Sequence, residues 1–362
     1  MTNKIMTNEM KRKYNAFWAH EYDGRAILQI EVPSPASFVK EPDDPAEKWE
    51  SIPSRIKSAR QFVENTRYLA EGLPNAWVNL GPGVLAAMLG SDYTYYPGTV
   101  WFGEKPGEKP MIREWSDMDN IALSPDNRMN RLVLEMTERF CKDSGGDYLV
   151  GITDIGGTLD ILASLRGTEQ LLTDLYDEPE EVEKAAAKID ALWLEAFSQS
   201  YSLLQKYNPD RAMTAWIPIW CTKSWFPLQC DFSAMLSPEH FGRFVMPSLV
   251  KGTDFLEHSV YHLDGVGEIP HLDMLLSIKR LDAIQWVPGD GKPGYADDGW
   301  FPLYERIQTA GKGLVLTGVS SAEDMLYLLK RLSHKGLFIS GWLKSAEEAE
   351  EVIRKAEEYA KC

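Results

Sequence analysis

Short apolar runs alternate with longer segments of helical periodicity along most of the chain. Runs rich in β-branched and other apolar residues predict eight strands, at residues 26–32, 75–80, 147–152, 212–217, 259–263, 283–286, 313–317 and 336–340. Apolar positions spaced three to four residues apart predict helices, at residues 53–71, 126–141, 179–206, 238–258, 322–332 and 345–360. Two of these helices carry start signals. Ser237-Pro238 places proline at the first helical position, and Ser345 with Glu348 predicts a capping box.

Eight strands with intervening helices predict an α/β fold, a single (β/α)8 TIM barrel, with a doubly wound sheet as the alternative. The barrel is favoured because eight strands close it and because no glycine fingerprint for a dinucleotide follows an early strand. Gly81-Pro82-Gly83 does not match G-x-G-x-x-G, and Pro82 lacks the N–H that a phosphate loop needs. We expect one domain over residues 1–362, with residues 1–25 as an N-terminal extension.

Catalytic groups of such barrels sit at the carboxyl ends of the strands and in the loops that follow. The side chains at those positions here are Glu31, Asn79, Asp154, Trp216, Asp231, His262, Asp264, Trp286, Asp290 and Trp342. Acidic and aromatic residues dominate this set, and Lys and Arg are almost absent from it. We therefore expect a small-molecule substrate that is neutral or cationic rather than strongly anionic.

Composition narrows the range of partners. The net charge of −16 argues against a nucleic-acid-binding protein and against docking on an anionic membrane. No apolar run approaches the roughly 20 residues of a membrane span, and the polar start does not resemble a signal peptide. Four cysteines are too few for a disulfide framework, so we expect a cytoplasmic protein. The 12 Trp either pack the core or wall an acidic cleft for a sugar, an amine or a methylated cation.

The sharpest local feature is the strand end Tyr261-His262-Leu263-Asp264-Gly265. Residues i and i+2 of a strand point to the same side, so His262 and Asp264 can face the barrel mouth together. They would serve as two metal ligands, or as an imidazole with its orienting carboxylate. The alternative is a buried histidine satisfied by a neighbouring aspartate.

Cys230-Asp231 is the second feature. Cys230 could give zinc a soft thiolate, and Asp231 could act as a general acid or base or anchor a cation. The alternative is that Cys230 is a small core residue and that Asp231 caps a turn. Asp154 follows a strand and precedes Gly156-Gly157, so it either reaches the cleft or lies where the glycines permit close packing.

Several segments resemble the uroporphyrinogen decarboxylase superfamily. They are residues 231–247 (DFSAMLSPEHFGRFVMP), 261–265 (YHLDG), 281–290 (LDAIQWVPGD) and 147–179, and in element order the resemblance covers residues 75–360. It implies a (β/α)8 barrel. The superfamily holds decarboxylases of the haem pathway and zinc-dependent methyltransferases that move methyl groups to or from corrinoid proteins.

The chain departs from both branches. The decarboxylases carry an R-Q-A-G-R motif and a strand-end aspartate, whereas the second strand here ends with Asn79. The methyltransferases bind zinc through H-x-C and a later cysteine, and this sequence has His262-Leu263-Asp264 and Ser340 or Trp342 instead. The HLDG variant is similar to a corrinoid-associated, methyltransferase-like subgroup. The resemblance therefore implies zinc as a candidate cofactor on His262, Asp264 and Cys230, although the family thiolates are missing.

The leading hypothesis is an enzyme that transfers a methyl group between a small methylated substrate and a separate corrinoid protein. The D-x-H-x-x-G loop that binds corrinoids is absent, so cobalamin would arrive only on a partner protein. Asp231, Glu31 and Asp154 would be acid/base groups, and the substrate would contact Trp286, Asn79, Trp216, Asp290 and Trp342. The alternatives are a lyase or hydrolase of a sugar-like substrate, a non-catalytic binding barrel, and a divergent decarboxylase.

Overall fold

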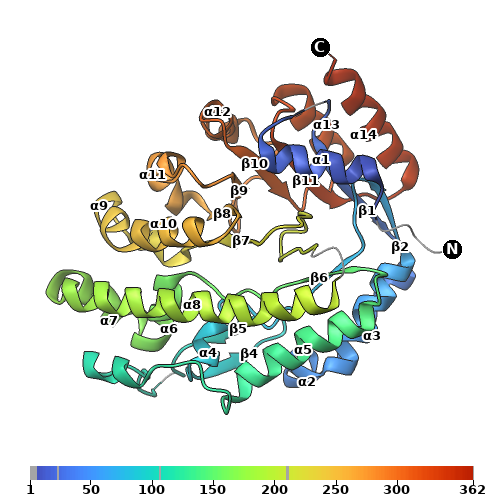
Figure 1. The fold of residues 1–362 in the computed structure, drawn as a ribbon. Coiled ribbons are helices and arrows are strands. Elements are labelled where there is room, and N and C mark those ends of the chain that lie inside the picture. Colours follow the sequence, from blue (N-terminus) through green and yellow to red (C-terminus); the bar gives the residue numbers. More distant parts are fainter. Residues whose placement is uncertain (1–5, 23, 106, 209–211, 362) are drawn as a thin grey trace.

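The central element of the fold is a seven-stranded sheet with the strand order β2-β1-β11-β10-β9-β8-β7 (Figure 1). The computed structural model describes residues 6–22, 24–105, 107–208 and 212–361. The strands of this sheet are β1 (Ile27–Pro33), β2 (Thr66–Ala70), β7 (Trp225–Leu228), β8 (His258–Asp264), β9 (Ala283–Val287), β10 (Gly313–Thr317) and β11 (Leu337–Trp342). Only β2 runs antiparallel to its neighbour, β1. The predicted α/β fold with a mostly parallel sheet is thus confirmed.

Four further strands form two small sheets. The strand β3 (Asn75–Trp77) pairs in parallel with β6 (Leu149–Gly151), and β4 (Tyr93–Tyr95) forms an antiparallel ladder with β5 (Val100–Phe102). Within the described residues, these ladders do not join the seven-stranded sheet into a closed eight-stranded barrel. The predicted count of eight strands is therefore wrong.

Two local features explain most of the difference. The predicted strand at residues 212–217 forms only isolated bridges at Met213 and Thr214. Pro218 follows directly, and proline restricts the residue before it and cannot donate to a ladder. In addition, residues 66–70 were expected to continue a helix, but α3 ends at Asn65 and β2 pairs with β1. Tertiary pairing overrides helical periodicity there.

The longer helices begin and end near the predicted positions. The helices are α1 (Asn8–Ala19), α2 (Pro45–Glu50), α3 (Ile52–Asn65), α4 (Leu85–Met88), α5 (Arg128–Ser144), α6 (Thr158–Arg166), α7 (Thr168–Asp177), α8 (Pro179–Tyr207), α9 (Pro238–His240), α10 (Met246–Phe255), α11 (Leu272–Ser277), α12 (Phe301–Thr309), α13 (Ala322–Arg331) and α14 (Ala346–Tyr359). The side chains of Ser237 and Ser345 accept hydrogen bonds from the backbone of the first turn, as the start signals predict. The helix expected at residues 238–258 instead ends at Phe255 and contains a π-turn at Phe241–Val245.

The helix α1 covers the amino-terminal ends of the strands. Trp18 donates a 2.9 Å hydrogen bond to the carbonyl of Trp220 and stacks on His258, the first residue of β8. The ring of Phe17 packs against Gly313 at the start of β10. This packing leaves the carboxyl ends of the strands for a site. Residues 1–5 and 23 of the predicted N-terminal extension lie outside the described residues.

The search for membrane-spanning helices was negative. In the described part of the chain, no helix combines the length and the apolar character that crossing a bilayer requires.

Candidate functional site

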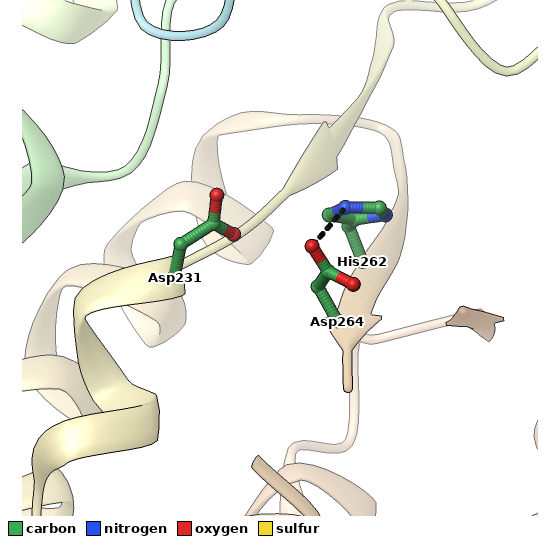
Figure 2. A group of neighbouring side chains, drawn as sticks. All are labelled: Asp231, His262 and Asp264. Atoms are coloured by element: carbon green, nitrogen blue, oxygen red, sulfur yellow. Dashed lines mark ion pairs between the residues drawn. The ribbon is translucent and has the colours of Figure 1, made fainter. Parts of the chain in front are cut away.

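Three predicted residues come together at the carboxyl ends of β7 and β8. These strands are parallel neighbours, with Leu228 opposite Tyr261, so the residues that follow β7 lie beside the end of β8. Asp231 begins the short helix η3 (Asp231–Met235) there and faces His262 and Asp264 (Figure 2). One ligand atom from each of the three side chains lies within 4.8 Å of the other two. The imidazole Nε2 of His262 is 4.0 Å from Oδ2 of Asp264.

The protonation of His262 is set by a neighbour that the sequence analysis did not select. The register of β8 and β9 places Gln285 opposite His262. The amide nitrogen of Gln285 donates to the hydroxyl of Thr317 at 2.6 Å, so its oxygen faces Nδ1 of His262, also at 2.6 Å. In the neutral imidazole the proton therefore sits on Nδ1, and Nε2 is free to accept a proton or a metal ion.

Further carboxyl groups surround these three residues. Burial raises the pKa of Asp154 to about 7, and the nearby charge of Asp231 adds to the shift. Burial likewise raises the pKa of Asp160 to about 7, again with a contribution from Asp231. The carboxylate of Asp231 is open to solvent, but the protein around the cleft still raises its pKa. The cluster thus holds more carboxyl groups than can all be charged at neutral pH.

Glu268 lies fully buried beneath Asp231 and accepts a 3.0 Å hydrogen bond from the hydroxyl of Tyr261. Burial and the charge of Asp231 raise the pKa of Glu268 to about 10, so this group is uncharged at neutral pH. Cys230 is also buried, and its burial raises the pKa of the thiol well above the ordinary value. Cys230 is not one of the three residues whose ligand atoms converge, and its environment disfavours a thiolate.

A cavity of about 420 Å³ adjoins the cluster at Asp231. We call it the hairpin cavity because the β4–β5 hairpin forms one wall; α6 and η3 contribute the others. Its lining residues are Pro82, Gly83, Val100, Trp101, Phe102, Gly103, Glu104, Asp160, Ile161, Ala163, Ser164, Thr168, Gln229, Asp231, Phe232 and Met235. Three of these carry carboxyl groups, and none is Lys or Arg.

Glu31 and Trp342 form a separate group at the ends of β1 and β11. The indole N–H of Trp342 donates a 2.6 Å hydrogen bond to Oε2 of Glu31, and burial raises the pKa of Glu31 to about 7. Three strands, β11, β10 and β9, lie between β1 and β8 in the sheet. No hydrogen bond or ion pair among the described residues joins Glu31 to the residues of Figure 2.

The structure distributes the other predicted contact residues unevenly. Trp216 presents its ring edge-on to His262, with ring centroids 6.0 Å apart. Trp286 is fully buried on the opposite face of β9 from Gln285 and packs against Trp300. Asn79 and Asp290 each accept a backbone N–H within a local turn.

Sequence reasoning missed Gln285, Thr317, Asp160, Glu268 and Trp101 as site residues. Gln285 carried a usable signal: it immediately precedes Trp286 on a strand, so the alternation of sides assigns one of the two to the site face. Asp160 stands in the first turn of α6, where an acidic residue is common, and its contact with η3 depends on the tertiary fold.

Comparison with known proteins gives one result for the fold. No protein-family model and no curated protein matches this chain. Among solved structures, a methyltransferase from Methanosarcina mazei superposes with a TM-score of 0.60 at 14% identity, over 97% of this chain and 98% of that one. At this identity the likeness shows a shared fold.

Proposed function

We propose that this chain is a methyltransferase that moves a methyl group between a small neutral or cationic methylated substrate and a corrinoid carried by a separate protein, on a (β/α)8-type barrel. The observation that carries the proposal is the convergence of Nε2 of His262 with the carboxylates of Asp231 and Asp264 next to the hairpin cavity. The fold shared with a methyltransferase and the resemblance of the strand-end motifs support it.

The three converging side chains fit a divalent metal ion. One imidazole nitrogen and two carboxylates form a ligand set that zinc accepts, and it is harder than a thiolate set. The hydrogen bond from Nδ1 of His262 to Gln285 is the outer contact that orients a metal-binding histidine. A metal ion bound there would act as a Lewis acid on the heteroatom that carries the methyl group.

The residues of the chain would hold the methyl donor and manage its charge. When the methyl carbon leaves, the electron pair of the broken bond stays on the heteroatom of the donor. A cationic donor thereby becomes neutral, and the carboxylates of Asp231 and Asp264 attract the donor more strongly than the product. This difference favours release of the product after transfer.

The charge of the hairpin cavity disfavours the decarboxylase alternative. A substrate with several carboxylates needs Arg or Lys to bind it, and none lines this cavity. The sugar-directed and non-catalytic alternatives are separated from the proposal by experiment.

Metal analysis and a transfer assay on the full chain test the proposal. We expect stoichiometric zinc in protein purified without added metal, and its loss in His262→Ala and in Asp264→Ala. Asp177→Ala, which removes an exposed carboxylate at the end of α7, should retain the metal. With reduced cobalamin supplied, a methylated amine should yield methylcobalamin, followed by its absorption spectrum. Metal that persists in both site variants, cleavage of glycosides without methyl transfer, or no turnover would each refute the proposal.

A further inference from the structure

The hairpin cavity has an aromatic wall that no burial requirement explains. Trp101 lies on β5 opposite Thr94 of β4, so the hairpin ladder fixes its position. Its side chain is nevertheless 60% exposed, and Met235 on η3 is 51% exposed. Both line the cavity, and Phe102 lies buried beside them. An apolar rim held open in this way is typical of a surface that a ligand covers.

The charge of the cavity is all of one sign. Glu104, Asp160 and Asp231 contribute carboxyl groups, and no basic side chain faces them from the lining residues. The oxygens of Asp160 accept the backbone N–H groups of Phe232 and Gly157. In the part of the chain that the structure describes, no hydrogen bond or ion pair engages the carboxylates of Glu104 or Asp231. These two remain available to a ligand.

We propose that the hairpin cavity binds a small methylated ammonium cation, with the ring of Trp101 against its methyl groups and the carboxylates of Glu104 and Asp231 balancing its charge. This inference rests on the proposed function and names its methyl donor. Methylated ammonium groups offer few or no hydrogen-bond donors, so proteins recognise them through aromatic faces and nearby negative charge. The volume of about 420 Å³ suits a small molecule.

The position of Asp231 links this cavity to the chemistry. Asp231 lines the cavity and is also one of the three residues whose ligand atoms converge within 4.8 Å. A cation held between Trp101 and Asp231 would therefore lie beside His262. The β4–β5 hairpin would then be the element that selects the substrate, while β7 and β8 carry the reacting groups.

Binding measurements on metal-free full-length protein test the inference without any turnover. The probes are choline and its uncharged carbon isostere 3,3-dimethylbutan-1-ol, titrated by calorimetry. We expect choline to bind at least about tenfold more tightly than the isostere. Trp101→Ala should weaken choline binding by about 3- to 30-fold, and Glu104→Gln should weaken it while leaving the isostere unaffected.

Tyr96→Ala is the matched control because Tyr96 is an exposed aromatic residue of the same hairpin that does not line the cavity. It should bind choline like the unmodified protein. Equal affinity for choline and the isostere, or full choline affinity in Trp101→Ala, would overturn the inference. Methyl transfer from an uncharged donor without any choline binding would overturn the substrate class alone. Choline binding without methyl transfer would instead contradict the proposed function.

Discussion

Nδ1 of His262 donates a 2.6 Å hydrogen bond to the side-chain oxygen of Gln285, which lies opposite it on the neighbouring strand. The Gln285 amide is itself oriented by its hydrogen bond to Thr317 on β10. Three adjacent strands thus fix one tautomer of one histidine, and they leave its Nε2 facing Asp264. The site depends on this chain of contacts as much as on the ligand atoms themselves.

Replacing Gln285 with alanine should weaken zinc binding about 10- to 100-fold, because the imidazole then loses the acceptor that holds its orientation. Competition with a chromophoric chelator measures this affinity. Gln285→Glu is the control, since it keeps an acceptor oxygen opposite Nδ1 and should retain most of the affinity. Unchanged zinc affinity in Gln285→Ala would show that the contact does not orient a metal ligand.

Asp154 should make the metal-free protein less stable as the pH rises. Its folded-state pKa of about 7 lies above the unfolded value of about 3.9, so the folded protein holds the proton more tightly. The stabilisation is complete below pH 4 and is lost as the pH rises through 7. Between pH 5 and pH 7 this group alone should lower the free energy of unfolding by about 3 kcal/mol.

The variant Asp154→Asn should lack that loss, whereas Asp177→Asn, an exposed carboxylate, should keep it. Denaturant unfolding at the two pH values compares the three proteins. Parallel pH dependence in Asp154→Asn and the unmodified protein would contradict a buried, protonated Asp154.

Gly157→Ala should destabilise the protein by about 1–3 kcal/mol, because a Cβ there would overlap the carbonyl oxygen of Gln229 at the end of β7. The same atom would press on the Asp160 carboxylate, whose other oxygen binds the backbone of η3. Gly294→Ala provides the control, since a Cβ at Gly294 meets no atom within 4 Å. Thermal unfolding of both variants gives the comparison, and equal midpoints would argue against the close approach.

The sequence by itself determined the local elements and one part of the site. Strand alternation correctly placed His262 and Asp264 on one side of β8, since the side-chain period of two follows from backbone geometry. Serine and proline signals gave the starts of α9 and α14 because capping is a contact within one helical turn. The bias toward acidic residues at strand ends was also readable, because parallel strands end at one edge of a sheet.

Only the tertiary structure decided which side chains meet. Glu31 and Asp231 both follow strands, but the sheet order separates β1 from β8. Trp286 lies on the far face of β9 and Gln285 on the near face, a choice set by the register with β8. The hairpin cavity joins β5, α6 and η3, which are distant in sequence. Such contacts depend on packing across the whole chain, and no local pattern encodes them.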